Sequence, residues 1–121
     1  MGFKISHINE NVIRNEMIGH FTAEDALAYE QEIKVHYEEA DSIGKQLHIY
    51  VDTSQFEKLS VEGRRTFSKM NQDNRLGRIA STGGNRILNT LARFIMIASK
   101  RNNIRYFSSE EEALDWLKSA D

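Results

Sequence analysis

The sequence contains no cysteine and no proline, and it has only one tryptophan among 121 residues. The absence of cysteine excludes disulfides, thiol catalysis and thiolate metal sites. No apolar run approaches the roughly 20 residues of a membrane-spanning helix, and no secretory signal pattern precedes the first predicted strand. We therefore expect a cytoplasmic protein. The length suits a single domain, residues 1–121, with one hydrophobic core.

Acidic residues are absent from one long window. Residues 74–109 contain seven arginines and lysines and no aspartate or glutamate, although the whole chain has a net charge of −2. A basic window of this kind favours an anionic partner. We do not expect nucleic acid as that partner, because few aromatic residues lie among the cations and the rest of the chain is acidic.

Residues that carry catalysis or bind metals do not form a recognisable pattern. The four histidines, His7, His20, His36 and His48, occur singly and lack the spacing of metal ligands, so we predict structural roles and no metal. Asp52 has no second carboxylate or histidine that spacing would place beside it. We therefore predict neither a cofactor nor an enzymatic activity.

The hydrophobic pattern predicts strands and helices in alternation. The predicted strands are 3–8, 12–21, 47–51, 78–81 and 104–107, and the predicted helices are 23–40, 60–70, 85–100 and 110–120. The expected N-caps are Thr22, paired with Asp25, then Ser60, and for the last helix the overlapping capping boxes of Ser108 and Ser109. The order β-β-α-β-α-β-α-β-α indicates an α/β fold with a mixed, mostly parallel five-stranded sheet flanked by four helices, in which the first two strands form an antiparallel hairpin.

Polar residues gather where the predicted central strand ends and the following helices begin. Strand carboxyl ends and helix amino ends meet at one edge of a parallel sheet, where binding sites are common. Two simpler explanations stay open: the polar residues after the strand bond nearby backbone amides, and the glycines at 83 and 84 form a tight turn. The predicted binding surface for a ligand or partner is Asp52, Ser54, Ser60, Glu62, Thr82, Gly84 and Arg86.

The helix predicted at 85–100 has an apolar face and a basic face. We expect six apolar residues, at positions 87, 88, 91, 94, 95 and 98, to pack on the core. Two apolar residues outside that face, Met96 and Ile97, lie among cations, and this arrangement suits contact with an anionic membrane surface. A solvated basic face, or a homodimer contact, is the alternative. The predicted membrane contacts are Arg86, Arg93, Met96, Ile97 and Lys100.

Three stretches resemble a known family. They are LHIYVD leading into the Ser60 helix, RIASTGGNRILNTLARF, and IRYFSSEEEALDWL near the end of the chain. Together they resemble the STAS family, the anti-sigma-factor-antagonist fold, and particularly its SpoIIAA-like bacterial branch. The resemblance implies a non-enzymatic regulatory module that acts through a protein partner.

One departure from the family pattern bears on regulation. Regulatory members carry Asp-Ser-Ser-Gly at the start of the helix, and a partner kinase phosphorylates the serine before the glycine. The matching residues here are Ser60-Val61-Glu62-Gly63, with a glutamate at the phosphorylated position. We therefore predict that the phospho-switch is absent. The SpoIIAA-like branch also resembles CRAL-TRIO lipid carriers, which implies as an alternative a carrier of lipid or another small apolar ligand that associates with anionic membrane.

Overall fold

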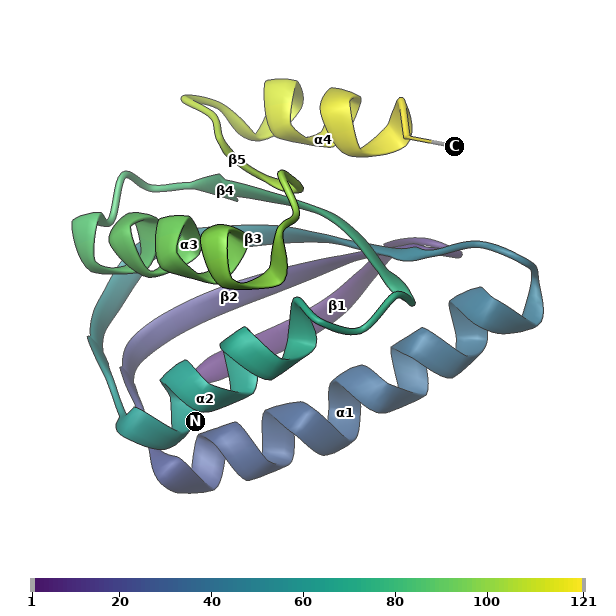
Figure 1. Ribbon diagram of the computed structural model, residues 1–121. Coiled ribbons are helices and arrows are strands. Elements are labelled where there is room, and N and C mark those ends of the chain that lie inside the picture. Colours follow the sequence, from purple (N-terminus) through teal and green to yellow (C-terminus); the bar gives the residue numbers. More distant parts are fainter. Residues whose placement is uncertain (1, 121) are drawn as a thin grey trace.

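The computed structural model describes residues 2–120, so Met1 and Asp121, the ends of the predicted domain, lie outside the described residues. The elements follow the order β1 (Phe3–Asn9), β2 (Val12–Phe21), α1 (Ala23–Ser42), β3 (Leu47–Leu59), α2 (Val61–Met70), β4 (Leu76–Thr82), α3 (Arg86–Ser99), β5 (Ile104–Tyr106) and α4 (Glu110–Lys118). The strands lie in sequence order across one sheet (Figure 1). β1 is antiparallel to β2, and the other neighbours are parallel. The predicted fold class is confirmed.

The two faces of the sheet carry different helices. Successive side chains of a strand point to opposite faces, so along β3 the side chains of Leu47 and Ile49 join one core and that of Tyr50 joins the other. The larger core lies against α1 and α2, with α3 on the same side of the sheet. The smaller core lies against α4, which covers the opposite face alone (Figure 1).

Aromatic rings fill the larger core between the sheet, α1 and α2. Phe21 and Tyr29 each contact both Phe3 and Phe67, with ring centroids 5.2 to 5.8 Å apart. Phe21 and Tyr29 are almost fully buried. Packed aromatic rings of this kind stabilise a core beyond the area that they bury.

The predicted N-caps set the starts of three helices. The Thr22 hydroxyl accepts a hydrogen bond from the Asp25 amide at 3.1 Å, and the Asp25 carboxylate accepts one from the Thr22 amide at 2.9 Å. The Ser60 hydroxyl accepts from an amide in the first turn of α2, and Ser109 does the same for α4. Such bonds satisfy amides that have no partner within the helix.

Strand β3 is longer than predicted. It continues from Val51 to Leu59, and its second half pairs with β2 alone, because the pairing with β4 ends where Asp52 meets Thr82. The ladder between β2 and β3 contains two register shifts. A bulge interrupts the alternation of inward and outward side chains, so the polar segment after Val51 does not show the period of two from which a strand is predicted.

Helix α3 packs less closely on the sheet than its sequence predicts. Of the six residues expected on its core face only Ile95 is buried, whereas Ile87 and Phe94 are 52% and 67% exposed. Met96, which was expected at the surface, is partly buried and lines a cavity beneath the helix. The predicted core face is wrong in its orientation, because its apolar stripe points partly into an open groove toward α2.

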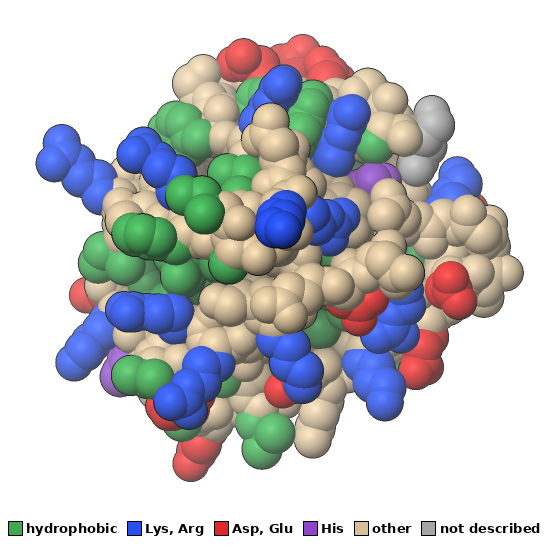
Figure 2. Space-filling model, viewed as in Figure 1, with side chains coloured by type: hydrophobic (Ala, Val, Ile, Leu, Met, Phe, Trp, Pro, Cys, Tyr) green, Lys and Arg blue, Asp and Glu red, His purple; other side chains and the backbone are tan. Residues whose placement is uncertain are grey.

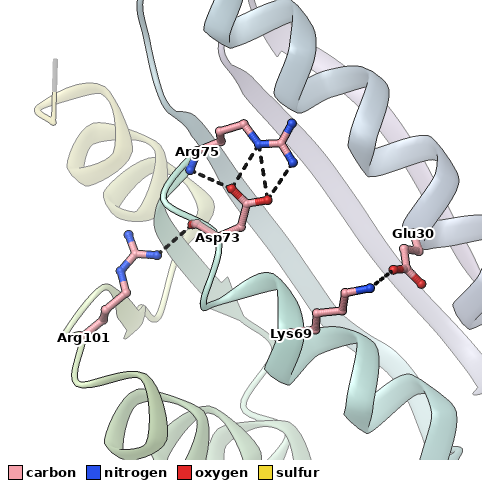
Figure 3. A network of polar contacts seen from close by, with 5 residues as sticks. All are labelled: Glu30, Lys69, Asp73, Arg75 and Arg101. Atoms are coloured by element: carbon pink, nitrogen blue, oxygen red, sulfur yellow. Dashed lines mark hydrogen bonds and ion pairs between the residues drawn. The ribbon is translucent and has the colours of Figure 1, made fainter.

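Polar contacts hold the end of α2 and the loop after it against their neighbours (Figure 3). Lys69 on α2 binds Glu30 on α1, with 2.8 Å between the nitrogen and oxygen. In the loop, Arg75 and Asp73 form an ion pair at 2.7 Å. Arg101, just after α3, donates a hydrogen bond to the backbone carbonyl of Asp73 at 3.2 Å. The carboxyl end of α3 is therefore fixed to this loop.

Candidate ligand-binding site

The structure divides the predicted binding surface into two parts. Asp52 lies beside Thr82 across β3 and β4, with Ser54 two residues further on. Ser60 and Glu62 lie at the start of α2, beyond the second half of β3. At about 3.3 Å per residue, that extended segment separates Ser54 from Ser60 by roughly 20 Å. Ser60 and Glu62 are thus set apart from Asp52 and Ser54, while Arg86 lines a groove together with Leu59, the residue before Ser60.

Several side chains of the predicted surface bond within the protein. The Asp52 carboxylate accepts a hydrogen bond from the Ser54 amide at 2.9 Å. The buried Thr82 hydroxyl lies 2.6 Å from the Tyr50 hydroxyl. The Ser60 hydroxyl caps α2. These local bonds match the simpler explanation for Asp52 and Ser60.

The turn from β4 into α3 requires glycine. Gly83 and Gly84 have φ angles of 102° and 66°, which side-chain-bearing residues rarely adopt. A Cβ atom on Gly83 would lie only 2.5 Å from the Ser54 amide nitrogen. Asn85 then caps α3 by accepting from the Leu88 amide. The glycines are explained by this close approach of two chain segments, and Gly84 needs no bound ligand to account for it.

A cavity of about 400 Å³ lies between α3 and the sheet. Small-molecule sites in proteins commonly have volumes of about 300 to 1,000 Å³ and mostly apolar walls. The walls here come from β2 to β5 and from α1, α2 and α3. The lining side chains that matter below are Asn15, Tyr29, Val51, Phe67, Ala92 and Met96.

Asn15, one of the residues that line this cavity, has a buried acceptor without a partner among the described residues. The residue is 1% exposed, and its amide nitrogen donates a hydrogen bond to the Tyr29 hydroxyl at 3.0 Å. Its Oδ1 atom has no hydrogen-bond partner among residues 2–120. Leaving such a buried acceptor unpaired costs about 1–3 kcal/mol, so a bound group that donates a hydrogen bond would recover that free energy.

Tyr29 supplies the complementary group. Burial raises the pKa of its hydroxyl, so the group keeps its proton at neutral pH. Because the hydroxyl oxygen accepts from Asn15, its own proton remains available to a ligand. Asn15 and Tyr29 together therefore offer one acceptor and one donor and carry no charge, while the cations Arg93 and Arg105 also line the cavity.

The sequence contained a signal for Asn15 that the predicted site missed. Ile13, Asn15 and Met17 alternate along β2 and all three are buried. The alternation places the Asn15 amide on the same buried face as Ile13 and Met17, and a buried amide needs hydrogen-bond partners. Its hydrogen bond with Tyr29 on α1 could not be predicted from the sequence, because nothing in the spacing links the two positions.

A second hollow, a groove of about 650 Å³, runs between α2 and α3. Ile87 and Phe94 line it together with Arg64 and Arg86. Figure 2 shows hydrophobic side chains gathered over α3 and toward α2, with lysine and arginine side chains around them. Neither arginine forms an ion pair within the described part of the chain. The groove is apolar with cations on its rim.

The predicted membrane-contact residues mostly share the outer surface of α3. Arg86, Arg93, Ile97 and Lys100 are exposed, and Ile97 is 72% exposed. Met96 is only partly exposed and lines the cavity, and the exposed Arg93 lines the cavity as well. None of the helices within residues 2–120 combines the length and apolarity that crossing a membrane requires.

Comparison with known proteins assigns the chain to a family. The fold is that of an α/β domain with one mixed sheet, and a model of the SpoIIAA-like family matches residues 12–118. The chain therefore belongs to the SpoIIAA-like family, and the resemblance seen in its sequence is confirmed at that level. Among curated proteins, none matches the chain.

Solved structures share the fold at low sequence identity. The unphosphorylated anti-sigma factor antagonist SpoIIAA is 12% identical with a TM-score of 0.70, and the alignment covers 96% of this chain and 97% of that one. The phosphorylated form of the Bacillus cell fate determinant SpoIIAA is 13% identical with a TM-score of 0.68, covering 94% and 97%. An uncharacterised protein from Shewanella loihica PV-4 with a SpoIIAA-like fold is 19% identical with a TM-score of 0.66, covering 95% and 91%.

Proposed function

We propose that this protein is a non-enzymatic binding protein that holds a small, largely apolar ligand between α3 and the sheet. The observation that carries the proposal is the unpaired Oδ1 atom of Asn15 in the wall of the cavity of about 400 Å³. Water would satisfy this oxygen too, but most of the cavity is lined by apolar side chains, which favour an apolar molecule.

The polar end of the cavity limits the chemistry of the ligand. Asn15 offers an acceptor and Tyr29 a donor, a combination that suits a hydroxyl group, which both donates and accepts. A carboxylate offers no donor to Asn15, although the cations Arg93 and Arg105 also line the cavity. We therefore expect a molecule with an apolar body whose alcohol group lies at Asn15 and Tyr29.

The first test is native mass spectrometry of the protein purified gently from its own host. We expect a retained adduct of lipid-like mass. A second test measures displacement of the dye 1-anilinonaphthalene-8-sulfonate by 1-decanol and by decanoate. The proposal expects decanol to displace the dye at lower concentration than decanoate. Equal displacement by the two would contradict the hydroxyl assignment.

A matched pair of variants locates the bound molecule. Ala92→Phe on α3 adds a ring to the cavity wall, whereas Thr90→Phe adds the same ring on the side of the groove. Ala92→Phe should abolish decanol binding and Thr90→Phe should preserve it. The reverse result would move the ligand to the groove between α2 and α3.

A second candidate function is a regulatory protein-interaction module, as the family resemblance implies. The observation that favours it is the apolar, cation-rimmed groove beside the start of α2, where Glu62 lies exposed. On this account the chain works without a phospho-switch, because Glu62 stands where regulatory members carry the phosphorylated serine and the Ser60 hydroxyl serves as the N-cap of α2. Peptide mass spectrometry across growth conditions should find Ser60 unmodified. A phosphate on Ser60 would contradict this account and indicate that the protein is regulated by phosphorylation at that residue.

Contact with an anionic membrane would suit the carrier function. The exposed side chains Arg86, Arg93 and Ile97 on α3 support it. Flotation with phosphatidylglycerol vesicles should be strong at low salt and weak for Arg86→Glu/Arg93→Glu, while Lys34→Glu/Lys58→Glu, with the same change of charge elsewhere, should still float. If the wild type fails to float, light scattering then tests whether the same face forms a homodimer.

A further inference from the structure

Two histidines that are far apart in the sequence meet between β1 and α1. Phe3 and Ile5 on β1 pack into the larger core, and His7 points to the same side two residues later. His36 and Glu39 lie three residues apart on α1, so they share one face of that helix. The candidate donor atoms of His7, His36 and Glu39 all lie within 4.8 Å of one another.

The contacts within this cluster leave one nitrogen without a partner. His7 Nε2 lies 3.2 Å from Glu39 Oε2, and the rings of His7 and His36 meet edge to face with centroids 4.8 Å apart. His36 is only 8% exposed, yet its Nδ1 atom has no hydrogen-bond partner among the described residues. A buried ring nitrogen without a partner is unfavourable, and neither the fold nor the proposed ligand site accounts for it.

We propose that His7, His36 and Glu39 bind a divalent transition-metal ion, with Zn²⁺ as the first candidate. Two imidazoles and one carboxylate form a donor set that Zn²⁺ uses in proteins, with a water molecule as the fourth ligand. The same donors also accept Co²⁺, Ni²⁺ and Cu²⁺. Hard cations such as Mg²⁺ and Ca²⁺ prefer oxygen ligands and are not expected here.

The three side chains can close around an ion by side-chain rotation alone, without movement of the backbone. Ligand atoms of a tetrahedral zinc site, each about 2.0–2.1 Å from the metal, lie roughly 3.3 Å from one another. The side chains of His7 and Glu39 are 57% and 48% exposed, so both are free to rotate toward the buried His36. His36 thus acts as the fixed member and the other two close on the ion.

The protonation of His36 is compatible with this role. Burial lowers the pKa of its imidazole, and the neighbouring His7 lowers it further, while Glu39 and Glu32 act in the opposite direction. The neutral ring is the form that binds a metal. The ion would join β1, an edge strand whose His7 precedes the residues matched by the family model, to the last turns of α1.

Titration of tag-free protein with Co²⁺ tests the proposal, because tetrahedral cobalt gives a characteristic visible absorption. We expect saturation at one ion per chain and loss of the absorption when Zn²⁺ is added. His7→Gln and Glu39→Gln alter exposed residues, so both variants should fold. Each should weaken metal binding by roughly 100-fold or more, since even changes to residues behind metal ligands cost 10–100-fold. His20→Gln, at an exposed histidine outside the cluster, is the matched control and should bind as the wild type does.

A thermal melt gives a second readout. Zn²⁺ should raise the melting temperature of the wild type and of His20→Gln, because an ion that binds only the folded state stabilises it, and should leave His7→Gln unchanged. The proposal is overturned if Co²⁺ does not saturate at one ion per chain, or if His20→Gln loses binding as His7→Gln does. Both results are independent of any ligand in the cavity beneath α3.

Discussion

Helices α1 and α3 lie on the same face of the sheet, but they use their apolar residues differently (Figure 1). α1 carries more polar residues, yet it buries a full stripe that includes Tyr29, Ile33 and Tyr37. α3 is the more apolar helix and buries only Ile95. An amphipathic pattern therefore shows which residues share a face, and what lies opposite that face decides whether they are buried.

The difference follows from what each helix faces. α1 packs against the aromatic cluster of Phe3, Phe21 and Phe67, which leaves little space. α3 lies over a cavity on one side and an open groove on the other. Apolar side chains that border a cavity or a groove stay partly in contact with water. A ligand or partner that covers them therefore gains the free energy of burying apolar surface. The four predictions below test this contrast.

The largest expected effect is on α1. Ile33→Ala should lower the free energy of unfolding by about 2–5 kcal/mol, because Ile33 is 2% exposed and its loss leaves a cavity. Phe94→Ala on α3 should change it by less than about 0.5 kcal/mol, because that ring is mostly in solvent. Urea unfolding followed by circular dichroism measures both. An equally large loss for Phe94→Ala would mean that the outer face of α3 is covered in solution.

Most substitutions in a protein core lower the free energy of unfolding, but one that fills the cavity beneath α3 should raise it. Ala92→Leu adds three carbon atoms to the cavity wall and should raise the free energy of unfolding by about 0.5–2 kcal/mol. The same change should abolish decanol binding. Thr90→Leu, which faces the groove, should change neither quantity by much. A destabilised Ala92→Leu variant would indicate that α3 packs more tightly than the cavity implies.

A smaller effect is expected at α2, which lies between the two helices. Ser60→Ala should cost about 1 kcal/mol because the hydroxyl caps the helix through the Gly63 amide. Ser60→Asp should retain most of the stability, since aspartate is also a good N-cap. Chemical unfolding of the two variants checks this. If Ser60→Ala were fully stable but impaired in partner binding, Ser60 would have a role beyond capping.

Much of the fold could be predicted from the sequence because its signals are local. The capping pair of Thr22 and Asp25 and the cap at Ser109 marked two helix starts correctly, and strand alternation gave the order of the elements. The second half of β3 was missed because bulges in its ladder hide the period of two. The boundaries 1–121 of the single domain stay a prediction.

The candidate sites were less predictable because they depend on pairs of distant residues. Asn15 on β2 meets Tyr29 on α1, and His7 on β1 meets His36 on α1, through packing that no short spacing encodes. The predicted binding surface is divided into two parts for the opposite reason. Its residues are close in sequence, but the long β3 strand carries Ser60 away from Asp52.

The smallest predicted effect concerns the loop that fixes the carboxyl end of α3. The pKa of Asp73 lies below its ordinary value of 3.8, chiefly because Arg75 donates hydrogen bonds to its carboxylate. A carboxylate with a lowered pKa in the folded state adds stability that is present above the unfolded pKa and is lost as pH falls through the folded pKa. Both side chains are partly exposed, so the contribution should stay below about 1 kcal/mol.

The measurement is urea unfolding of the wild type and of Asp73→Asn between about pH 2 and pH 7, since the asparagine keeps the shape and removes the charge. The wild type should be the more stable protein at neutral pH, and the difference should vanish once the pH is below the pKa of Asp73 in the folded protein. Glu38→Gln, at an exposed carboxylate on α1 outside its first turn, is the control and should follow the wild type. A difference between wild type and Asp73→Asn that persists undiminished at the lowest pH would show that the charge of the Asp73 carboxylate does not account for the effect of the substitution. In that case the hydrogen bonds from Arg101 to the backbone carbonyls of Asn71, Asp73 and Leu76 would be the main links between the end of α3 and the loop.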